Sequence, residues 1–482
     1  MSSSLGSKAA SGAVWATIDK FGTMVLQFVV NLILARLLIP SDFGAIGMLA
    51  IFIAVSQVLI DGGFGSALIQ KKHPTQTDFS TIFYWNLAFS TFLYFILFFC
   101  APFISEFFSM PILKGVLRGI GLTLITNSIL VIQKVRLQKQ LAFKIIAVSN
   151  LNSYVIASSI GIGMAYYGEG VWSLVIMQII YTVIAVTVLG IITRWHPSLC
   201  FSSQSMKELF SFGGYMMAAN ILQEICKNLQ GLIIGRKFSA SQMGYYSQAY
   251  KLEQVSGHSI PQVIVQIMYP IYSSLQDNRQ RLNEIVMINM RVISFLVFPL
   301  IGCLIFIAEP LIVFLYGNKW LPSVPYFQIL CVGGFFVCLQ NINFYAVAAV
   351  GKSRSLFKWS FYKWGFLLVA LLTGMNFGMY GILWSMVLSS LNIFMTNAYL
   401  SYRHTGLSIM EQIASIGPVC LISLISFLIG ITCIYLHIAV IWAGLVFLVL
   451  YFILSFTFHL KALKDITVIM NNILKRNIKK QK

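Results

Sequence analysis

Long apolar stretches follow one another along almost the whole chain. A helix needs about 20 consecutive apolar residues to cross the hydrocarbon layer of a membrane. The charged fraction is 10%, against about 25% in an average soluble domain, which is too little to cover a soluble surface. The sequence therefore predicts an all-α polytopic membrane protein with about fourteen transmembrane helices. They are expected near residues 12–38, 42–68, 79–101, 111–133, 144–166, 170–193, 207–235, 242–272, 285–308, 322–350, 355–376, 379–401, 413–435 and 438–460.

Lysine and arginine are distributed unevenly over the two sides that these helices define. Of the 33 Lys and Arg residues, 22 lie on one set of connections and at the termini, whereas 6 lie on the opposite set. Because cytoplasmic loops carry the excess of Lys and Arg, both termini are expected in the cytoplasm, which requires an even number of crossings. This topology accounts for the net charge of +19, so no nucleic-acid partner is expected.

Two segments of the chain recur in the same order. Asn31–Arg36 resembles Gly231–Arg236, and at the same offset Gly44 matches Gly244. The segments 101–104 and 309–312 resemble each other as well. Because an even number of predicted helices separates the copies, the repeat is parallel, with its axis along the membrane normal. The expected organisation is a six-helix lobe in residues 1–200, a second one in 201–402, and two additional helices with a basic cytoplasmic tail in 403–482.

Three of the predicted helices carry polar residues at helical spacing, which places them on one face of each helix. The first, seventh and eighth helices contribute the candidate binding residues Lys20, Gln27, Asn31, Asn220, Lys227, Lys251 and Gln254. Polar groups within a membrane are costly and mark functional sites by default. A shared hydrated cavity is therefore the favoured interpretation, and hydrogen bonding between helices is the alternative.

Titratable residues in or near the spans are candidates for coupling transport to an ion. They are Asp19, Asp61, Glu224, Glu253 and His258. Structural roles remain open for most of them: Asp61 precedes two glycines and could cap a helix break, and Glu224 could simply neutralise Lys227. Arg291 and Lys363 are expected to extend toward the headgroups.

No enzyme signature is present in the sequence. It has no P-loop, no nucleotide-binding domain and no His/Cys spacing for a metal. The eight cysteines are interpreted as buried apolar side chains. We therefore expect neither a catalytic site nor a cofactor, and transport driven directly by ATP is excluded for this chain alone.

The chain resembles bacterial polysaccharide flippases of the multidrug/oligosaccharidyl-lipid/polysaccharide exporter superfamily. The similarity is carried by residues 10–42, ending in Leu-Ala-Arg-Leu-Leu-Ile-Pro-Ser-Asp-Phe-Gly44, by 61–70, and by Met-Gly-Tyr-Tyr-Ser-Gln-Ala-Tyr at 243–250. It extends over nearly the whole chain and is strongest toward the lipopolysaccharide and exopolysaccharide branch, whose members have fourteen helices.

The resemblance implies two six-helix lobes, with the first, second, seventh and eighth helices lining a central cavity. It implies movement of an undecaprenyl-pyrophosphate-linked oligosaccharide to the outer leaflet of the bacterial cytoplasmic membrane, for O-antigen, capsule or exopolysaccharide synthesis. The sequence leaves open whether transport is coupled to an ion; a proton or sodium gradient is the candidate energy source, and other membrane proteins of polysaccharide assembly are candidate partners. Lys20, Lys227 and Lys251 are the candidates for the pyrophosphate, although the family more often uses arginine.

Other functions remain open on the sequence alone. A multidrug or cation exporter of the same superfamily would need an acidic cavity, whereas the predicted stripes carry both signs of charge. A membrane glycan polymerase or ligase would be expected to have a large external loop, and no predicted external loop exceeds about 20 residues. A scaffold without transport would leave the polar stripes unexplained.

Overall fold

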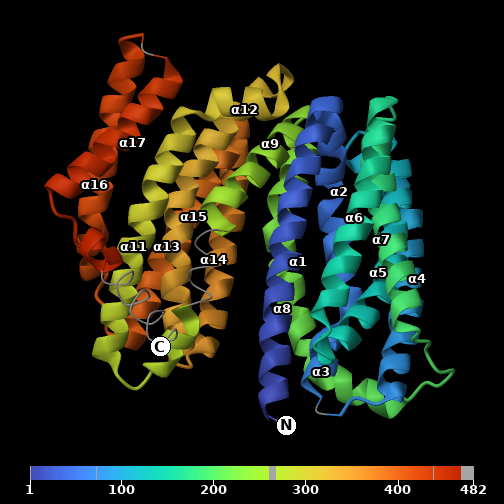
Figure 1. The fold of residues 1–482 in the computed structure, drawn as a ribbon. Helices are drawn as coiled ribbons and strands as arrows, with labels where there is room; N and C mark the ends of the chain where they lie inside the picture. The colour runs from blue at the N-terminus through green and yellow to red at the C-terminus, as the bar shows by residue number, and fades with distance from the viewer. Residues whose placement is uncertain (1, 72, 260–267, 438, 468–482) are drawn as a thin grey trace. The chain divides into compact units, whose positions relative to one another are not determined.

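The structure is a computed structural model that describes residues 2–71, 73–259, 268–437 and 439–467 (Figure 1). All regular secondary structure in these residues is helical. The chain forms two compact units, Met1–Gly244 and Tyr245–Lys482, and each is described by itself. The predicted all-α polytopic fold is confirmed.

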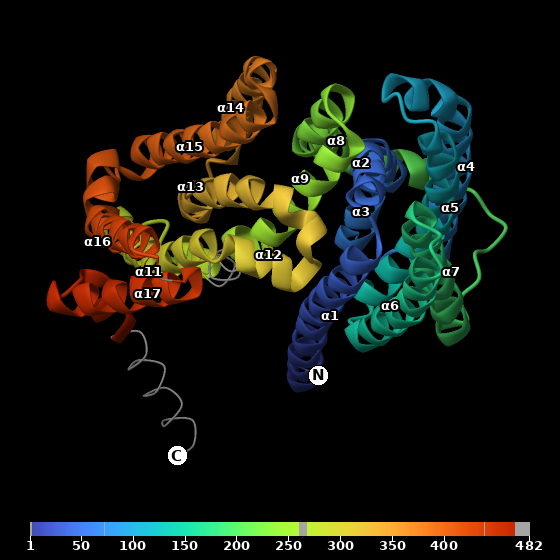
Figure 2. The same cartoon turned by 90° about the horizontal axis from the view of Figure 1, so that it is seen from above.

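The first unit is a bundle of long helices joined by short connections. They are α1 (Ser2–Leu37), α2 (Pro40–Asp61), α3 (Phe64–Gln70), α4 (Gln76–Phe107), α5 (Ile112–Lys139), α6 (Phe143–Tyr166), α7 (Val171–Thr193) and α8 (Ser203–Lys237), followed by the start of α9 (Ala240–Glu253). Seen along the helix axes, α4 and α5 lie side by side, as do α6 and α7 (Figure 2). The unit extends past the predicted lobe boundary at residue 200 because α8 packs against α2, α3 and α4.

The second unit begins within α9, and the structure describes further helices in it. They are the π-helix η1 (Gln254–Ser259), α11 (Arg279–Phe306), α12 (Ala308–Tyr316), the 3-10 helix η2 (Asn318–Ser323), α13 (Val324–Ala349), α14 (Ser353–Gly374), the 3-10 helix η3 (Met375–Phe377), α15 (Gly378–Thr405), α16 (Ile409–Tyr435) and α17 (Val440–Thr457). α13, α14 and α15 pack together, while α16 and α17 pack against α11.

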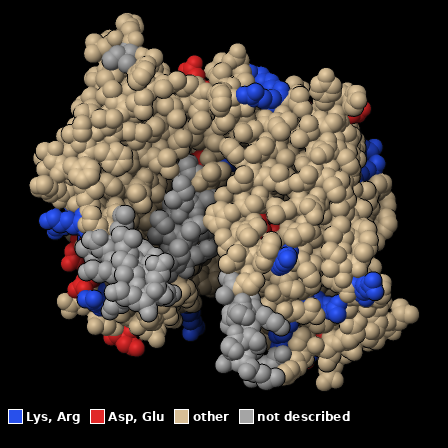
Figure 3. All heavy atoms as spheres, viewed as in Figure 1, with Lys and Arg blue, Asp and Glu red and all other residues tan. Residues whose placement is uncertain are grey.

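Eleven stretches of the described residues are long and apolar enough to cross a membrane. One of them, Ser353–Thr405, contains both α14 and α15. α8 and α9 are not among the eleven: α8 carries several of the polar side chains that the sequence singled out, and α9 has only 14 residues, too few to cross a membrane. On the face shown in Figure 3, uncharged residues cover most of the surface, as lipid contact requires.

The repeat is visible at two equivalent turns. α1 ends at Leu37 and α2 begins at Pro40, while α8 ends at Lys237 and α9 begins at Ala240. In both turns the side chain at the third helical position accepts a hydrogen bond from the backbone N–H of the residue before the helix. These bonds join Ile39 N to Asp42 Oδ2 at 3.2 Å and Ser239 N to Gln242 Oε1 at 3.3 Å.

The two turns also fit into each other through equivalent glycines. A Cβ atom on Gly44 would collide with the carbonyl of Ala240, and one on Gly244 would collide with the carbonyl of Pro40. Each copy of the repeat thus leaves room for the backbone of the other. The resemblance found in the sequence is confirmed at this point as a structural equivalence.

The last two helices are anchored to α11 by polar as well as apolar contacts. Arg291 Nη1 donates to Ser415 Oγ on α16 at 3.3 Å, and Tyr451 Oη on α17 donates to the carbonyl of Phe295 at 3.0 Å. Arg291 Nε also donates to Asp465 Oδ2, which lies after α17, at 2.7 Å. The guanidinium of Arg291 thus meets a carboxylate beyond α17 within the unit, and its extension toward the headgroups stays a prediction.

Candidate functional site

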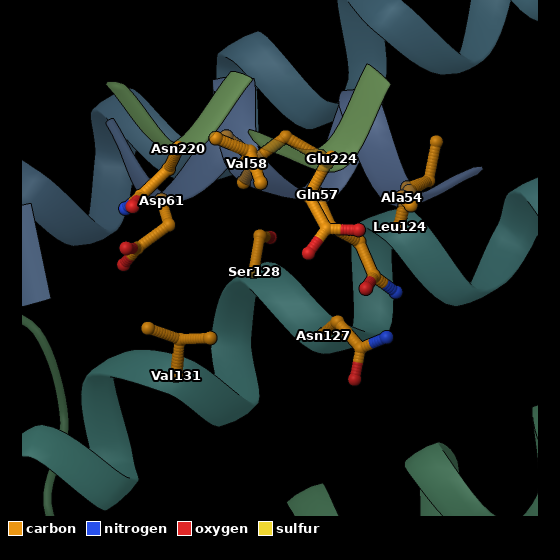
Figure 4. A pocket seen from close by; sticks show the side chains of 11 residues that line it. Ala54, Gln57, Val58, Asp61, Leu124, Asn127, Ser128, Val131, Asn220 and Glu224 are labelled. Carbon is orange, nitrogen blue, oxygen red and sulfur yellow. The ribbon is translucent and has the colours of Figure 1, made fainter. Parts of the chain in front are cut away.

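A polar pocket lies among α2, α5 and α8 in the first unit (Figure 4). Its volume is about 380 Å³. The polar groups on its wall are two carboxylates, three carboxamides and one hydroxyl, and aliphatic side chains complete the lining. The lining residues are Ala54, Gln57, Val58, Ile60, Asp61, Leu124, Asn127, Ser128, Val131, Asn220 and Glu224.

The carboxylate of Asp61 is held at the end of α2 by the backbone that follows it. Gly62 and Gly63 have φ values of 53° and 72°, which glycine adopts without strain, and they break the helix before α3. The backbone N–H groups of Gly63 and Gly65 hydrogen-bond to the Asp61 side chain. The predicted capping role of Asp61 is therefore observed, and the same residue also lines the pocket.

Glu224 reaches the pocket from α8 and is held by two neighbours on its own helix. Asn228 Nδ2 donates to Glu224 Oε2 at 3.1 Å, and Lys227 Nζ lies 3.8 Å from Glu224 Oε1. The Lys227 side chain is 58% exposed and that of Glu224 is 26% exposed, so this is a weak pair of partly solvated charges. The ion pair expected between Glu224 and Lys227 is observed.

The neutral polar groups of the pocket come from all three helices. Gln57 is exposed on α2, whereas Asn127 on α5 and Asn220 on α8 are half-buried. Ser128 donates its hydroxyl to the carbonyl of Ile125 at 2.7 Å and accepts from the Ser90 hydroxyl at 3.1 Å. In Figure 4 Asn127 and Ser128 on α5 lie across the same space from Gln57 and Glu224.

The pocket brings together three of the predicted site residues and leaves out the others. Asp61, Asn220 and Glu224 line it. On α1, Lys20 and Gln27 are exposed and Asn31 is half-buried, but none of them lines it. Asp19 instead accepts from Asn150 Nδ2, at 3.0 Å to Oδ1 and 3.2 Å to Oδ2.

The other predicted residues belong to the second unit. Lys251 is exposed on α9, Gln254 is half-buried in η1, and Glu253 is 5% exposed. A Cβ atom on Gly257 would collide with the carboxylate of Glu253. The buried side chain of Glu253 therefore packs against the backbone of η1 at Gly257. The side chain of His258 lies outside the described residues.

A buried lysine in the second unit differs from the sequence-based expectation. Lys363 is 7% exposed, and its Nζ donates to Asn397 Oδ1 at 3.1 Å. Asn397 is oriented by its own Nδ2, which donates to the carbonyl of Gln340 at 3.0 Å. The expectation that Lys363 extends to the headgroups is wrong, because its side chain points toward α13 and α15 and finds an acceptor there.

Comparison with known proteins decides the family. The profile of the family described as "Polysaccharide biosynthesis protein" matches residues 33–325, which is more than half of the chain. The chain belongs to this family. Its relatives include the teichuronic acid biosynthesis protein TuaB of Bacillus subtilis, 24% identical over 72% of this chain and 73% of the relative. The succinoglycan biosynthesis transport protein ExoT of Rhizobium meliloti is 25% identical over 72% of this chain and 70% of ExoT.

Two solved structures share the fold at low sequence identity. The lipid II flippase MurJ, in an inward closed conformation, matches with a TM-score of 0.72 and 13% identity, over 92% of this chain and 98% of MurJ. An inward-facing multidrug transporter of the MATE family matches with a TM-score of 0.58 and 12% identity, over 79% of this chain and 95% of that one. The chain is thus a multi-pass membrane protein with the fold of the exporter superfamily that its sequence resembles.

Proposed function

We propose that the protein moves a lipid-linked oligosaccharide across the bacterial cytoplasmic membrane, from the cytoplasmic to the outer leaflet. The observation that carries the proposal is membership of the polysaccharide biosynthesis family, with a relative named as a transport protein. The fold supports it, since MurJ is named as a lipid II flippase. The chain acts as a transporter without catalytic chemistry, and its two predicted six-helix lobes move against each other to expose the substrate alternately to either side.

A gradient of protons or sodium ions supplies the energy in this proposal, and no cofactor takes part. Among the candidate coupling residues, Asp61 and Glu224 share the pocket, whereas Asp19 is bound to Asn150 elsewhere in the same unit. Polar and ionisable groups inside a membrane commonly serve such coupling. The partners are the lipid-linked substrate, the surrounding bilayer and other membrane proteins of polysaccharide assembly.

A flipping assay in vesicles tests the proposal directly. The purified chain is reconstituted with an undecaprenyl-pyrophosphate-linked oligosaccharide, and a membrane-impermeant lectin reports how much of the sugar reaches the outer leaflet. We expect transfer well above that in protein-free vesicles. Transfer no faster than in those vesicles would overturn the proposal.

A cation exporter is the second candidate, because Asp61 and Glu224 place two carboxylates in the pocket. The same vesicles loaded with a monovalent organic cation dye separate the two functions. Gradient-dependent movement of the dye without movement of the lipid-linked sugar would favour the exporter.

The pyrophosphate group gives a prediction about the exposed lysines. Burying one unpaired charge costs several kcal/mol even after relaxation, so a carrier of a pyrophosphate must supply cations. Lys20, Lys227 and Lys251 are the candidates, since each has part of its surface exposed to solvent. We expect Gln at each position to slow flipping, and Arg to retain more activity than Gln because charge is the property required.

Two comparisons make this prediction specific. Lys358 provides the matched control, because it is exposed, lies near the start of α14 and belongs to no polar stripe. The Lys358→Gln variant should flip the substrate at the wild-type rate. Normal flipping by all three Gln variants, at wild-type levels in the membrane, would show that the headgroup is held by other residues.

A further inference from the structure

The size of the pocket among α2, α5 and α8 limits what it can hold. Pockets that bind small molecules have volumes of about 300 to 1,000 Å³, and this one has about 380 Å³. It is therefore large enough for one sugar unit but too small for a whole oligosaccharide. The partly exposed aliphatic side chains of Val58 and Val131 can cover the C–H faces of a sugar ring.

The polar groups of the pocket complement hydroxyl groups. Each sugar hydroxyl can donate one hydrogen bond and accept others, and it needs both kinds of partner when it is buried. Asp61 and Glu224 offer acceptors, whereas the carboxamides of Gln57, Asn127 and Asn220 offer both donors and acceptors. Glycine N–H groups hold Asp61 and Asn228 holds Glu224, so both carboxylates are oriented before a ligand arrives.

The charge of the pocket sets a preference among sugars. Two of its lining residues are acidic, and none of them is Lys or Arg. Lys227 pairs with Glu224 but is itself not part of the lining. A hexuronic acid would bring a third carboxylate into this space, and like charges placed together at a binding surface cost several kcal/mol.

A simple cation site agrees less well with these residues. The amide N–H groups of the pocket would have no role toward a cation, whereas they can donate to sugar oxygens.

We infer that this pocket binds an uncharged or amino sugar of the transported oligosaccharide and discriminates against acidic sugars. The inference rests on the proposed function and adds a sugar-selective subsite to it, contributed by Gln57, Asp61, Asn127, Asn220 and Glu224. The exporter would then recognise its substrate partly through the sugar rather than through the pyrophosphate alone.

Competing vesicle assays test the selectivity. The assay compares two lipid-linked oligosaccharides. They differ in one sugar, which is a hexose in the first and the corresponding hexuronic acid in the second. The wild-type protein should flip the neutral form about tenfold faster or more, as expected when like charges oppose binding. In the double variant Asp61→Asn with Glu224→Gln, which preserves shape but removes the charges, the ratio should fall toward one. Glu106→Gln, an exposed acidic site on α4 outside the pocket, should leave the ratio unchanged.

Direct binding separates failure of the subsite from failure of the proposed function. The midpoint of thermal unfolding of the full-length protein is measured with N-acetylglucosamine, glucosamine or glucuronic acid. The first two should raise it in the wild type but not in Asn127→Leu, and glucuronic acid should not raise it. Sugar binding that depends on Asn127, without flipping of any lipid-linked sugar, would leave the subsite standing and refute the flippase.

Three outcomes would overturn the inference itself. They are equal flipping of the neutral and acidic substrates by the wild type, a selectivity that survives the double variant, and no stabilisation by any of the three sugars. The pocket would be a cation site instead if no sugar binds and sodium chloride raises the midpoint of thermal unfolding more than choline chloride does. That difference would then be lost in the double variant.

Discussion

At the scale of single residues, Lys363 shows how a charge is accommodated inside the second unit. Its ammonium group has Asn397 as acceptor at 3.1 Å and the ring of Phe344 with its centroid 5.9 Å away. None of the residues of α13, α14 and α15, all of which the structure describes, is Asp or Glu. The amide oxygen of Asn397 and the aromatic face are therefore what stabilises this charge.

This arrangement predicts opposite effects for its two partners. Asn397→Leu leaves the buried ammonium without its acceptor and should destabilise the protein by about 1–3 kcal/mol. Lys363→Met removes the charge at similar length and should be neutral or stabilising. Because the penalty of Asn397→Leu comes from Lys363, it should largely disappear in the double variant. The midpoint of thermal unfolding in detergent is measured for the two single variants and the double variant. If Lys363→Met lowers this midpoint as much as Asn397→Leu does, the account is contradicted.

The sequence identified part of the candidate site and missed the rest for a physical reason. Asp61, Asn220 and Glu224 were found because charged or amide groups are conspicuous within apolar helices. Gln57, Asn127 and Ser128 were missed, because single amide and hydroxyl groups on α2 and α5 stand out less than charges do. The spacing of Gln57 four residues before Asp61 is a signal that could have found it. Which face of a helix meets protein and which meets lipid depends on packing, and hydropathy does not record it.

At the scale of helices, hydropathy predicted most boundaries because the cost of unpaired backbone groups in lipid forces long helices. The helix expected at 207–235 is α8 (Ser203–Lys237), and that expected at 144–166 is α6 (Phe143–Tyr166). The short helices α3, α12 and η2 were not predicted as separate elements, because each is too short to cross a membrane on its own. The helix expected at 242–272 is α9 only as far as Glu253, and part of its remainder lies outside the described residues.

The reciprocal fit of the two turns gives a prediction at this scale. Gly44→Ala adds a methyl group where the Ala240 carbonyl lies, and Gly244→Ala does the same against Pro40. Overpacking of this kind costs about 1–3 kcal/mol, because backbone atoms cannot move aside as a side chain can. We expect both variants to lower the midpoint of thermal unfolding and to slow flipping.

Gly163→Ala is the matched control, since Gly163 is helical and has nothing within 4 Å of an added Cβ. Alanine is favoured over glycine within a helix by about 0.5–1 kcal/mol, so this variant should be unchanged or slightly stabilised. Gly44→Ala and Gly244→Ala behaving like Gly163→Ala would show that the turns are not tightly fitted.

At the scale of the whole molecule, the repeat relates segments that are 200 residues apart. The sequence suggested it from a few identities, and the structure shows the same helix ends and the same capping bonds at both turns. The predicted lobes at 1–200 and 201–402 remain a prediction, whereas the two compact units divide after Gly244. Composition could not predict this division, because α8 packs with helices that precede it by more than a hundred residues.

Topology is the last prediction and follows from charge. Lys and Arg are retained on the cytoplasmic side during insertion, and the ratio of 22 to 6 leaves one orientation favoured. In a chain freed of its eight cysteines, single cysteines at Gln140, Arg281 and Lys358 should be labelled by an impermeant maleimide only after the cytoplasmic side is opened. Cysteines at Glu106, Glu169 and Phe377 should be labelled in intact cells. All six positions are exposed, so a missing label reports the side of the membrane rather than burial. Labelling of any of the first three positions in intact cells would show that this segment faces the outside.

A further cysteine at Lys482 reports the side of the C-terminus. Its labelling in intact cells would contradict both the even number of crossings and the parallel repeat.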